Sequence, residues 1–314
     1  MKKIAFIFPC YNEEETMISS KEQILLKFNQ LIFSKLIDRE SRICFVNDGS
    51  RDNTWSIIES FKEEEIIGIK LTRNFGHQFA LLAGLDALKN QFDAYITMDV
   101  DLQDDINSLD DMIGEFQKGF DVVYGVRNDR TSDSLFKKIT AEFFYRMMGK
   151  LGVKTIFNHA DYRLISNTAL NEFLKYEESH LFLRGIFPLV GLKQSQIYYK
   201  RNPRMLGESK YPLNKMISFA WEGITSFSVK PLKLITTIGA LSLIISMFLS
   251  IWAILQLIIG STITGWTSIV ILIIFFGGIQ SISLGIIGEY LGKIYMQSKN
   301  RPRYGIEIIK KNDE

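Results

Sequence analysis

The sequence predicts an α/β domain with a mainly parallel sheet, followed near the C-terminus by a two-helix transmembrane hairpin. Three observations support this prediction. Short β-rich runs alternate with longer helical stretches over the first 230 residues, polar clusters follow several of these runs, and the 55 residues from 234 to 288 contain no Asp, Glu, Lys or Arg. The 314 residues are also enough to bury a sizeable core.

Five runs are expected to be the strands of this sheet. Runs such as ICFV and AYITM are apolar on both faces, as in a parallel sheet that helices cover on each side. Ligands of such sheets bind at the carboxyl ends of the strands. The expected strands are 4–8, 42–47, 66–71, 94–98 and 122–126.

Polar motifs follow four of these strands directly. They are PCYNEEE at 9–15, NDGSRDNT at 47–54, TRNFGH at 72–77 and DVDLQDD at 99–105. Singly, each motif has a structural explanation: Asp52 or Asn53 could cap a helix, and Gly49 could form a turn. Their placement at four strand ends together predicts one binding crevice.

The DVDLQDD motif predicts a cation site. Asp99, Asp101 and Gln103 alternate along the chain, so their oxygens are expected to point the same way. Such hard ligands suit Mg²⁺ or Mn²⁺, and few protein ligands leave positions for substrate phosphates. Because no glycine-rich phosphate loop precedes these acids, the metal is expected to neutralise a diphosphate. Asp48 suits a hydrogen bond to a base or ribose.

Charge and cysteine content exclude other classes. The chain has 37 basic and 35 acidic residues, a net charge of +2, which argues against a general nucleic-acid binder. Cys10 and Cys44 lack metal-ligand spacing and indicate neither a disulfide framework nor a zinc site. They are interpreted as buried cysteines in a reducing compartment, with a reactive thiol as the alternative.

The charge-free stretch is too long for one membrane crossing of about 20 residues and suits two, 234–259 and 267–288. GSTITGW, 260–266, supplies the turn. Basic residues flank the stretch on both sides, which predicts that both flanks and both termini are cytoplasmic. The alternative is a pair of core helices in a soluble protein. The flanking basic residues are Lys215, Lys230, Lys233, Lys293, Lys299, Arg301 and Arg303.

Two further stretches, 135–151 and 213–229, combine basic and bulky apolar residues and are expected to be amphipathic helices at the membrane interface. Core packing is the alternative for both. Small residues of the second span provide surfaces for close helix approach, either within the hairpin or in a homo-oligomer. They are Gly277, Gly278, Ser281, Ser283, Gly285 and Gly288.

In order and spacing, PCYNEE, NDGSRD, TRNFG and DVDLQDD resemble the family-2 glycosyltransferases with the GT-A fold. HADYRLIS, FLRGIFPLVG, YKRNPRMLGESKYPLNK and the two terminal spans extend the resemblance to the polyprenyl-phosphate branch. That branch includes bactoprenol glucosyltransferases and dolichol-phosphate mannose synthases. The resemblance covers nearly the whole chain.

The resemblance implies a role for each matching residue. Pro9, Tyr11, Glu13, Asp48 and Arg73 are assigned to the nucleotide, together with Asp99. Asp99, Asp101 and Gln103 are assigned to the metal and diphosphate, and Asp161 and Asp101 to the reacting centre. A lipid phosphate acceptor would explain basic residues elsewhere in the domain, because arginine forks suit phosphate. These are Arg127, Arg130, Arg201, Arg204 and Lys210.

The resemblance, with the predicted metal site and membrane hairpin, therefore implies an inverting, metal-dependent transfer of a sugar from a nucleotide-sugar donor to polyprenyl (undecaprenyl) phosphate at the cytoplasmic face of a cell membrane. By the same analogy, UDP-glucose is the first choice of donor, with UDP-GlcNAc and GDP-mannose as alternatives. A processive polysaccharide synthase and a catalytically silent scaffold are the rival functions. The expected organisation is a catalytic domain, 1–230, a membrane hairpin, 231–290, and a cytoplasmic tail, 291–314.

Overall fold

The computed structural model describes residues 1–128, 156, 159–178, 181–201, 225, 228–259 and 265–312. These residues fall into two compact units. The first contains the described residues up to Arg201 together with 301–312, and the second contains 225, 228–259 and 265–300. The last twelve described residues therefore belong to the first unit, although they follow the predicted membrane segment in the chain.

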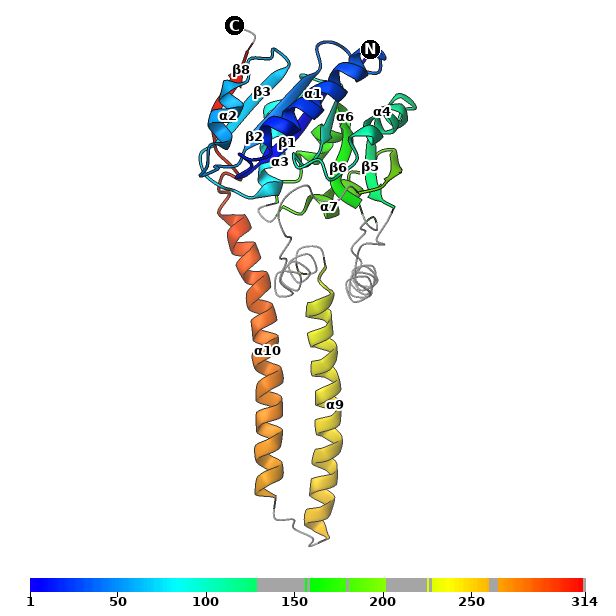
Figure 1. Cartoon of the computed structure of the whole chain (residues 1–314). Coiled ribbons are helices and arrows are strands. Elements are labelled where there is room, and N and C mark those ends of the chain that lie inside the picture. The colour runs from blue at the N-terminus through cyan, green and yellow to red at the C-terminus, as the bar shows by residue number, and fades with distance from the viewer. Residues whose placement is uncertain are drawn as a thin grey trace. The chain divides into compact units, whose positions relative to one another are not determined.

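The first unit is built on an eight-stranded mixed sheet with the order β7-β5-β6-β4-β1-β2-β3-β8 (Figure 1). β4, β1, β2 and β3 are mutually parallel, as are β5 and β7, whereas β6 and β8 run antiparallel to their neighbours. The strands are β1 (Ile4–Cys10), β2 (Arg42–Asn47), β3 (Ile66–Leu71), β4 (Ala94–Thr97), β5 (Val122–Arg127), β6 (His159–Ser166), β7 (Gln194–Tyr199) and β8 (Ile306–Lys311).

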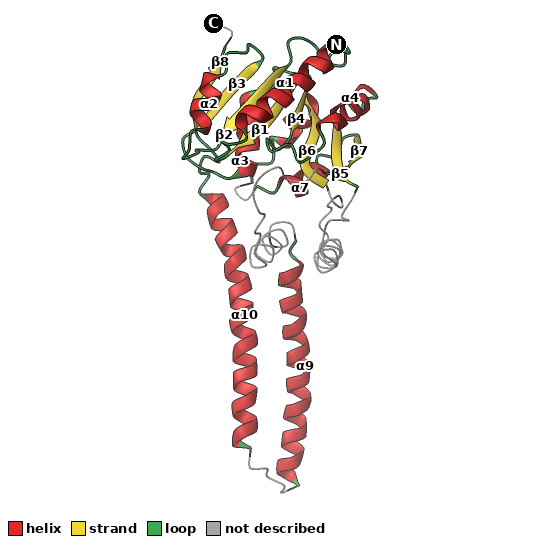
Figure 2. Cartoon of the chain, viewed as in Figure 1, coloured by secondary structure: helices red, strands yellow, loops and turns green. Residues whose placement is uncertain are grey.

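Helices of the first unit alternate with these strands (Figure 2). They are α1 (Met17–Phe33), α2 (Thr54–Ser60), α3 (His77–Ala87), α4 (Leu109–Gln117), α6 (Asn167–Phe173) and α7 (Leu183–Ile186), with 3-10 turns η1 (Ile106–Ser108) and η2 (Phe187–Leu189). The mainly parallel α/β architecture predicted from the sequence is confirmed, and it is of the kind that the resemblance to GT-A enzymes implies.

Alternation along the central strands creates a core on each face of the sheet. Phe6 and Phe45 pack with Phe28 of α1 and Phe61 after α2. On the opposite face, α3 lies close to the sheet at Gly84, where a Cβ would come within 2.7 Å of Ile7 Cγ2. Both faces of the inner strands are therefore buried, which is why these strands appear as continuous apolar runs in the sequence.

The second unit contains two long helices, α9 (Lys230–Ile258) and α10 (Trp266–Ser298). Among the residues that the structure describes, one helix, Lys230–Gln256, is long and apolar enough to cross a membrane by length and composition, and none of its most apolar stretch is buried. α10 continues ten residues beyond the predicted end of the second span. The two-helix transmembrane hairpin remains a prediction.

The predicted interfacial helix 135–151 lies outside the described residues, as does most of 213–229. Of the second stretch, Thr225, Ser228 and Val229 are described. Lys293 Nζ donates a hydrogen bond to Thr225 Oγ1 at 2.6 Å, and Tyr290 Oη donates one to the Ser228 carbonyl at 2.5 Å.

Candidate active site

The loops that follow β1 and β2 are linked by hydrogen bonds. The Asn12 amide donates to Ser50 Oγ at 3.0 Å, and the Arg51 amide donates to Asn12 Oδ1 at 2.9 Å. The Glu13 amide donates to Thr54 Oγ1 at 2.9 Å. Because each loop satisfies polar groups of the other, PCYNEEE and NDGSRDNT form one folded surface at the carboxyl edge of the sheet.

Asp48 connects this surface to the loop after β3. Its side chain is buried and accepts hydrogen bonds from the amides of Phe75, at 2.7 Å, and Gly76, at 2.9 Å. Burial raises the pKa of Asp48, and these two amide donors oppose the shift. Asp48 therefore holds the TRNFGH loop in place, and a contact with a nucleoside remains a prediction.

Gly49 is required by the same junction. Its φ is +61°, and a Cβ there would lie 2.3 Å from the Arg73 carbonyl carbon and 2.4 Å from the Asn74 nitrogen. The glycine of NDGSRD is thus explained by the close approach of two strand-end loops.

The DVDLQDD segment turns sharply after β4. Leu102 has a φ of +50°, its amide donates to the Asp99 carbonyl at 3.4 Å, and the Gln103 amide donates to Asp101 Oδ1 at 3.2 Å. Burial, together with the nearby carboxylates of Asp104, Asp161 and Asp101, raises the pKa of Asp99 to about 6, and His77 opposes this shift.

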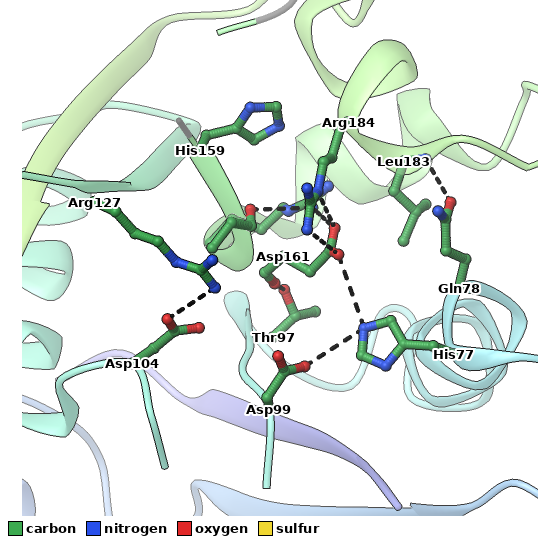
Figure 3. Close-up of polar contacts among 12 residues, drawn as sticks. His77, Gln78, Thr97, Asp99, Asp104, Arg127, His159, Asp161, Leu183 and Arg184 are labelled. Carbon is green, nitrogen blue, oxygen red and sulfur yellow. Dashed lines mark hydrogen bonds and ion pairs between the residues drawn. The ribbon is translucent and has the colours of Figure 1, made fainter. Parts of the chain in front are cut away.

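Asp161 lies on β6 and is held between two arginines (Figure 3). Arg163 Nη2 donates to Asp161 Oδ1 at 2.5 Å, and Arg184 Nη2 donates to Oδ2 at 3.0 Å. Burial alone would raise the pKa of Asp161, but Arg184 and Arg163 outweigh it and hold this pKa well below its ordinary value. Asp161 is consequently ionised at any physiological pH.

His77, the first residue of α3, lies between Asp161 and Asp99 in Figure 3. Its Nε2 is 3.5 Å from Asp99 Oδ1 and 3.9 Å from Asp161 Oδ2. The next residue, Gln78, accepts a hydrogen bond from the Leu183 amide at 2.9 Å, which ties the start of α3 to the start of α7 beside Arg184. The start of α3, the loop after β4 and the start of β6 thus meet at one point.

Arg127 occupies a second polar cluster beside this point (Figure 3). Its Nη2 donates to Asp104 Oδ1 at 3.2 Å, and its Nε donates to Tyr199 Oη at 3.3 Å. Tyr199 donates in turn to Asp104 Oδ1 at 2.6 Å. Asp104 is 2% exposed, so its charge is compensated almost entirely by this cluster. The acceptor-phosphate role of Arg127 remains a prediction.

The remaining predicted residues have simpler surroundings. Pro9 is buried in β1, and Tyr11 is 42% exposed. The Glu13 side chain accepts from Thr16 Oγ1 at 2.8 Å, and the Arg73 guanidinium lies 4.0 Å from the ring centroid of Phe75. Arg201 is exposed. Arg130, Arg204 and Lys210 lie outside the described residues.

Five residues of the site received no role from the sequence. Their motifs contained hints, because TRNFGH ends in a histidine, ADYRL places an arginine two residues after Asp161, and FLRGIF carries another. A strand places residues i and i+2 on the same face, which could have suggested the pair with Asp161. The five are His77, Asp104, Arg163, Arg184 and Tyr199.

The site suits a cation that has few protein ligands. Among the described residues, no group of three or more His, Cys, Asp or Glu side chains is arranged to hold a metal ion by itself. Burial and the nearby carboxylates nevertheless raise the pKa of Asp99, and a divalent cation beside this carboxylate would favour its ionised form. Asp99 and Asp101, with phosphate oxygens of a substrate, offer the hard ligands that Mg²⁺ or Mn²⁺ prefers.

Comparison of the sequence with known proteins places the chain in a family. Residues 5–174 match the model of glycosyl transferase family 2. The chain is 46% identical to the Bacillus subtilis (strain 168) protein named uncharacterized glycosyltransferase YkoT, over 99% of this chain and 93% of the relative. It is 39% identical to the prophage bactoprenol glucosyl transferase homolog of Escherichia coli (strain K12), over 98% of this chain and 100% of the relative.

The bactoprenol glucosyl transferase of Shigella phage SfX is also 39% identical, over 98% of this chain and 100% of that protein. Each of these similarities extends through both the site and the apolar C-terminal helices. The matched segment, 5–174, contains β2 to β6, all of β1 except Ile4, and every carboxylate described above. The chain belongs to glycosyl transferase family 2.

Proposed function

We propose that the protein transfers glucose from UDP-glucose to polyprenyl phosphate, with undecaprenyl phosphate as the carrier, at the cytoplasmic face of the cell membrane. The observation that carries the proposal is the convergence of Asp99 and Asp161 on His77, at 3.5 and 3.9 Å. It sets a carboxylate suited to a metal and diphosphate beside a carboxylate that two arginines keep ionised.

The donor would occupy the loops after β1, β2 and β3, with its diphosphate toward Asp99 and Asp101. Gln103, which is 6% exposed, belongs to the same turn, and its amide donates to Asp101 Oδ1. A bound Mg²⁺ or Mn²⁺ would supply Lewis-acid stabilisation of the charge that develops on the departing diphosphate. Asp99, Asp101 and Gln103 would hold that ion.

The reaction would be a single displacement. An oxygen of the acceptor phosphate forms a bond to the anomeric carbon, while the bond from this carbon to the diphosphate oxygen breaks and its electron pair leaves with the nucleoside diphosphate. One displacement inverts the configuration. Because a phosphate monoester has a second pKa near about 6, the acceptor is largely ionised at neutral pH and needs no strong base.

Asp161 would therefore orient the reacting groups rather than remove a proton. Its pKa lies well below the ordinary value, which makes it a poor base, whereas its paired arginines give it a defined position. Arg184 is 31% exposed and is suited to face the acceptor phosphate from the same ion-pair cluster.

The names of the relatives support a lipid-phosphate acceptor, since two of them are bactoprenol glucosyl transferases or homologues of these. The acceptor phosphate would meet Arg127 and Arg201, with Arg130, Arg204 and Lys210 as further predicted partners. None of the most apolar stretch of α9 is buried, and α10 exposes side chains such as Ile273, Phe275 and Ile282. Exposed apolar helices of this length are stable in a bilayer, which supports the predicted hairpin. The basic residues on both sides of it support the prediction that its flanks are cytoplasmic.

A donor screen tests the proposal. The purified full-length protein would be incubated with undecaprenyl phosphate, a divalent cation and one of UDP-glucose, UDP-GlcNAc or GDP-mannose, and the lipid product would be weighed by mass spectrometry. A glucosyl phospholipid from UDP-glucose is expected. A product with one of the other two sugars would correct the donor, and absence of any lipid-linked product would overturn the proposal.

A further inference from the structure

The C-terminal segment, defined as residues 301–312, returns to the catalytic sheet. β8 pairs antiparallel with the outer edge of β3, with Ile69 opposite Ile309 and Leu71 opposite Ile306, and the register shifts between Lys70 and Leu71 (Figure 1). It covers an edge whose backbone groups would otherwise be unpaired.

Side chains attach the segment at several points. Arg303 Nη1 donates to the Tyr176 carbonyl at 3.1 Å, and the Tyr304 hydroxyl makes a short hydrogen bond to the Asp86 carboxylate near the end of α3. At the other end of β8, Lys310 Nζ donates to the Phe61 carbonyl at 2.6 Å. The segment is thus tied to α3, to the chain after α6 and to the chain after α2.

A backbone contact of the C-terminal segment reaches the candidate donor site. The Thr72 amide, directly after β3, donates to the Gly305 carbonyl at 2.9 Å. A Cβ on Gly305 would lie 3.0 Å from Thr72 Oγ1 and 3.4 Å from its Cγ2, so the two backbones are close. Thr72 begins the loop that leads to α3, whose first residue is His77. We call this loop, residues 72–76, the donor loop.

The donor loop has two anchors. At its start, Thr72 is held by Gly305 of the C-terminal segment. Near its end, the amides of Phe75 and Gly76 are held by Asp48, at 2.7 and 2.9 Å. Since His77 follows at once and lies 3.5 Å from Asp99, a displacement of either anchor would move the contact between α3 and the carboxylates.

We propose that the C-terminal segment is a positioning element of the donor site, acting through the contact of Gly305 with Thr72. This inference rests on the proposed function in one respect, that the donor loop helps to bind the nucleotide sugar. A purely structural role would make the segment a cover for the β3 edge, whose loss lowers stability without a particular effect on the loop.

The two roles are separated by variants at opposite ends of β8. Gly305→Val introduces a side chain against Thr72, and Gly305→Ala is the milder form if the valine variant folds poorly. Thr72→Ala removes the Oγ1 and Cγ2 atoms that an added Cβ would meet, so the double variant Gly305→Ala/Thr72→Ala is the rescue. Lys310→Ala is the matched control, because it removes attachments of β8 to the carbonyls of Glu59 in α2 and Phe61 directly after it.

Two measurements on the full-length protein decide between the roles. Hydrogen exchange would follow peptides containing Phe75 and Gly76, and steady-state kinetics would give KM for UDP-glucose and kcat. For the Gly305 variants we expect faster exchange in the donor loop and a KM raised about tenfold with kcat changed less, a perturbation of binding equivalent to roughly 1.4 kcal/mol. The double variant Gly305→Ala/Thr72→Ala should bring both the exchange rate and KM most of the way back to those of the unaltered protein. Lys310→Ala should change neither the exchange rate of the donor loop nor KM.

Equal exchange and equal KM in Gly305→Val and Lys310→Ala would overturn the inference, as would failure of Thr72→Ala to rescue. If the unaltered protein turned over none of the three donors, the proposed function would fail instead. The exchange measurement would still decide whether the segment positions the loop.

Discussion

Arg184 and Asp161 form an ion pair with Nη2 3.0 Å from Oδ2, and Arg163 closes the other side of the same carboxylate at 2.5 Å. This carboxylate is 10% exposed, so its charge needs both partners. The arrangement makes Asp161 a fixed negative charge at the centre of the site. Because its pKa lies well below the ordinary value, Asp161 cannot act as a base that takes up a proton near neutral pH.

Asp161→Asn is expected to lower turnover by about 100-fold or more, because a group that orients reactants is lost. The remaining activity should show the same pH dependence as the unaltered enzyme between pH 6 and 9, since the pKa of Asp161 lies well below this window. Turnover measured across that range checks the prediction. An unchanged rate would remove Asp161 from the reaction, and the loss in the variant of an ionisation that the unaltered enzyme shows near neutrality would favour a base.

Stability must be measured alongside, because Asp161→Asn leaves Arg163, which is 1% exposed, without its charged partner, at a cost of about 3–5 kcal/mol. Asp161→Glu is the control. It keeps the charge for the arginines but moves it by one methylene, so it should lose turnover while retaining more of the thermal stability.

Asp104→Asn and Tyr199→Phe are expected to raise KM for the lipid phosphate about tenfold while leaving KM for the donor nearly unchanged. Both remove groups that hold Arg127, Asp104 by an ion pair at 3.2 Å and Tyr199 by a hydrogen bond at 3.3 Å. Ser195→Ala, which removes a hydrogen bond to Glu115 from the same strand as Tyr199, is the matched control. A similar rise of KM for the lipid phosphate in Ser195→Ala would show that the effect comes from a disturbance of β7 and not from the loss of the groups that hold Arg127.

His159 should make the unaltered protein less stable in mild acid. It is 3% exposed, and burial beside Arg163 lowers its pKa from 6.5 to about 3. Between these values the unfolded chain binds a proton that the folded chain does not, so stability falls as pH falls below 6.5, by at most about 1.4 kcal/mol per unit. Thermal unfolding at pH 7, 6 and 5 measures this slope.

Asp99 acts in the opposite direction, because its pKa is raised from 3.8 to about 6 and it favours the folded state as pH falls through that range. The prediction therefore concerns the difference between the unaltered protein and His159→Gln, in which the contribution of Asp99 cancels. The variant should lose less stability between pH 7 and 5. Parallel curves for the two proteins would contradict it.

Membrane topology can be tested with single cysteines, because the native Cys10 and Cys44 are both buried. If the two long helices form a hairpin with cytoplasmic flanks, Ser261→Cys should react with a membrane-impermeant maleimide in intact cells. Ser298→Cys should react only after the membrane is opened. Labelling of both positions from the same side would exclude two crossings.

The bounds of the central strands could be predicted from the sequence. β2 and β3 begin and end where expected, because each is a buried apolar run that a polar strand-end motif terminates. Asp99 was singled out because it follows a strand directly, and Asp161 because HADYRLIS resembles the family motif. The roles of both carboxylates in the reaction remain predictions.

β8 was not predicted. Its side chains are mostly exposed, and it pairs with a strand more than 230 residues earlier, so no buried apolar run indicates it. The partners of Asp161 and Arg127 were missed for a related reason. Arg184 and Asp104 come from separate segments, and their convergence on β6 and β5 is a property of the tertiary fold.

The most direct test of the central claim is release of nucleoside diphosphate from UDP-glucose by the purified full-length protein, with and without polyprenyl phosphate and a divalent cation. Release is expected only when lipid phosphate and cation are both present, and Asp101→Ala should abolish it while the protein still inserts into membranes. The account would be contradicted if Asp101→Ala released nucleoside diphosphate at the rate of the unaltered protein. It would also be contradicted if the rate of release changed neither on omission of lipid phosphate nor on addition of a chelator.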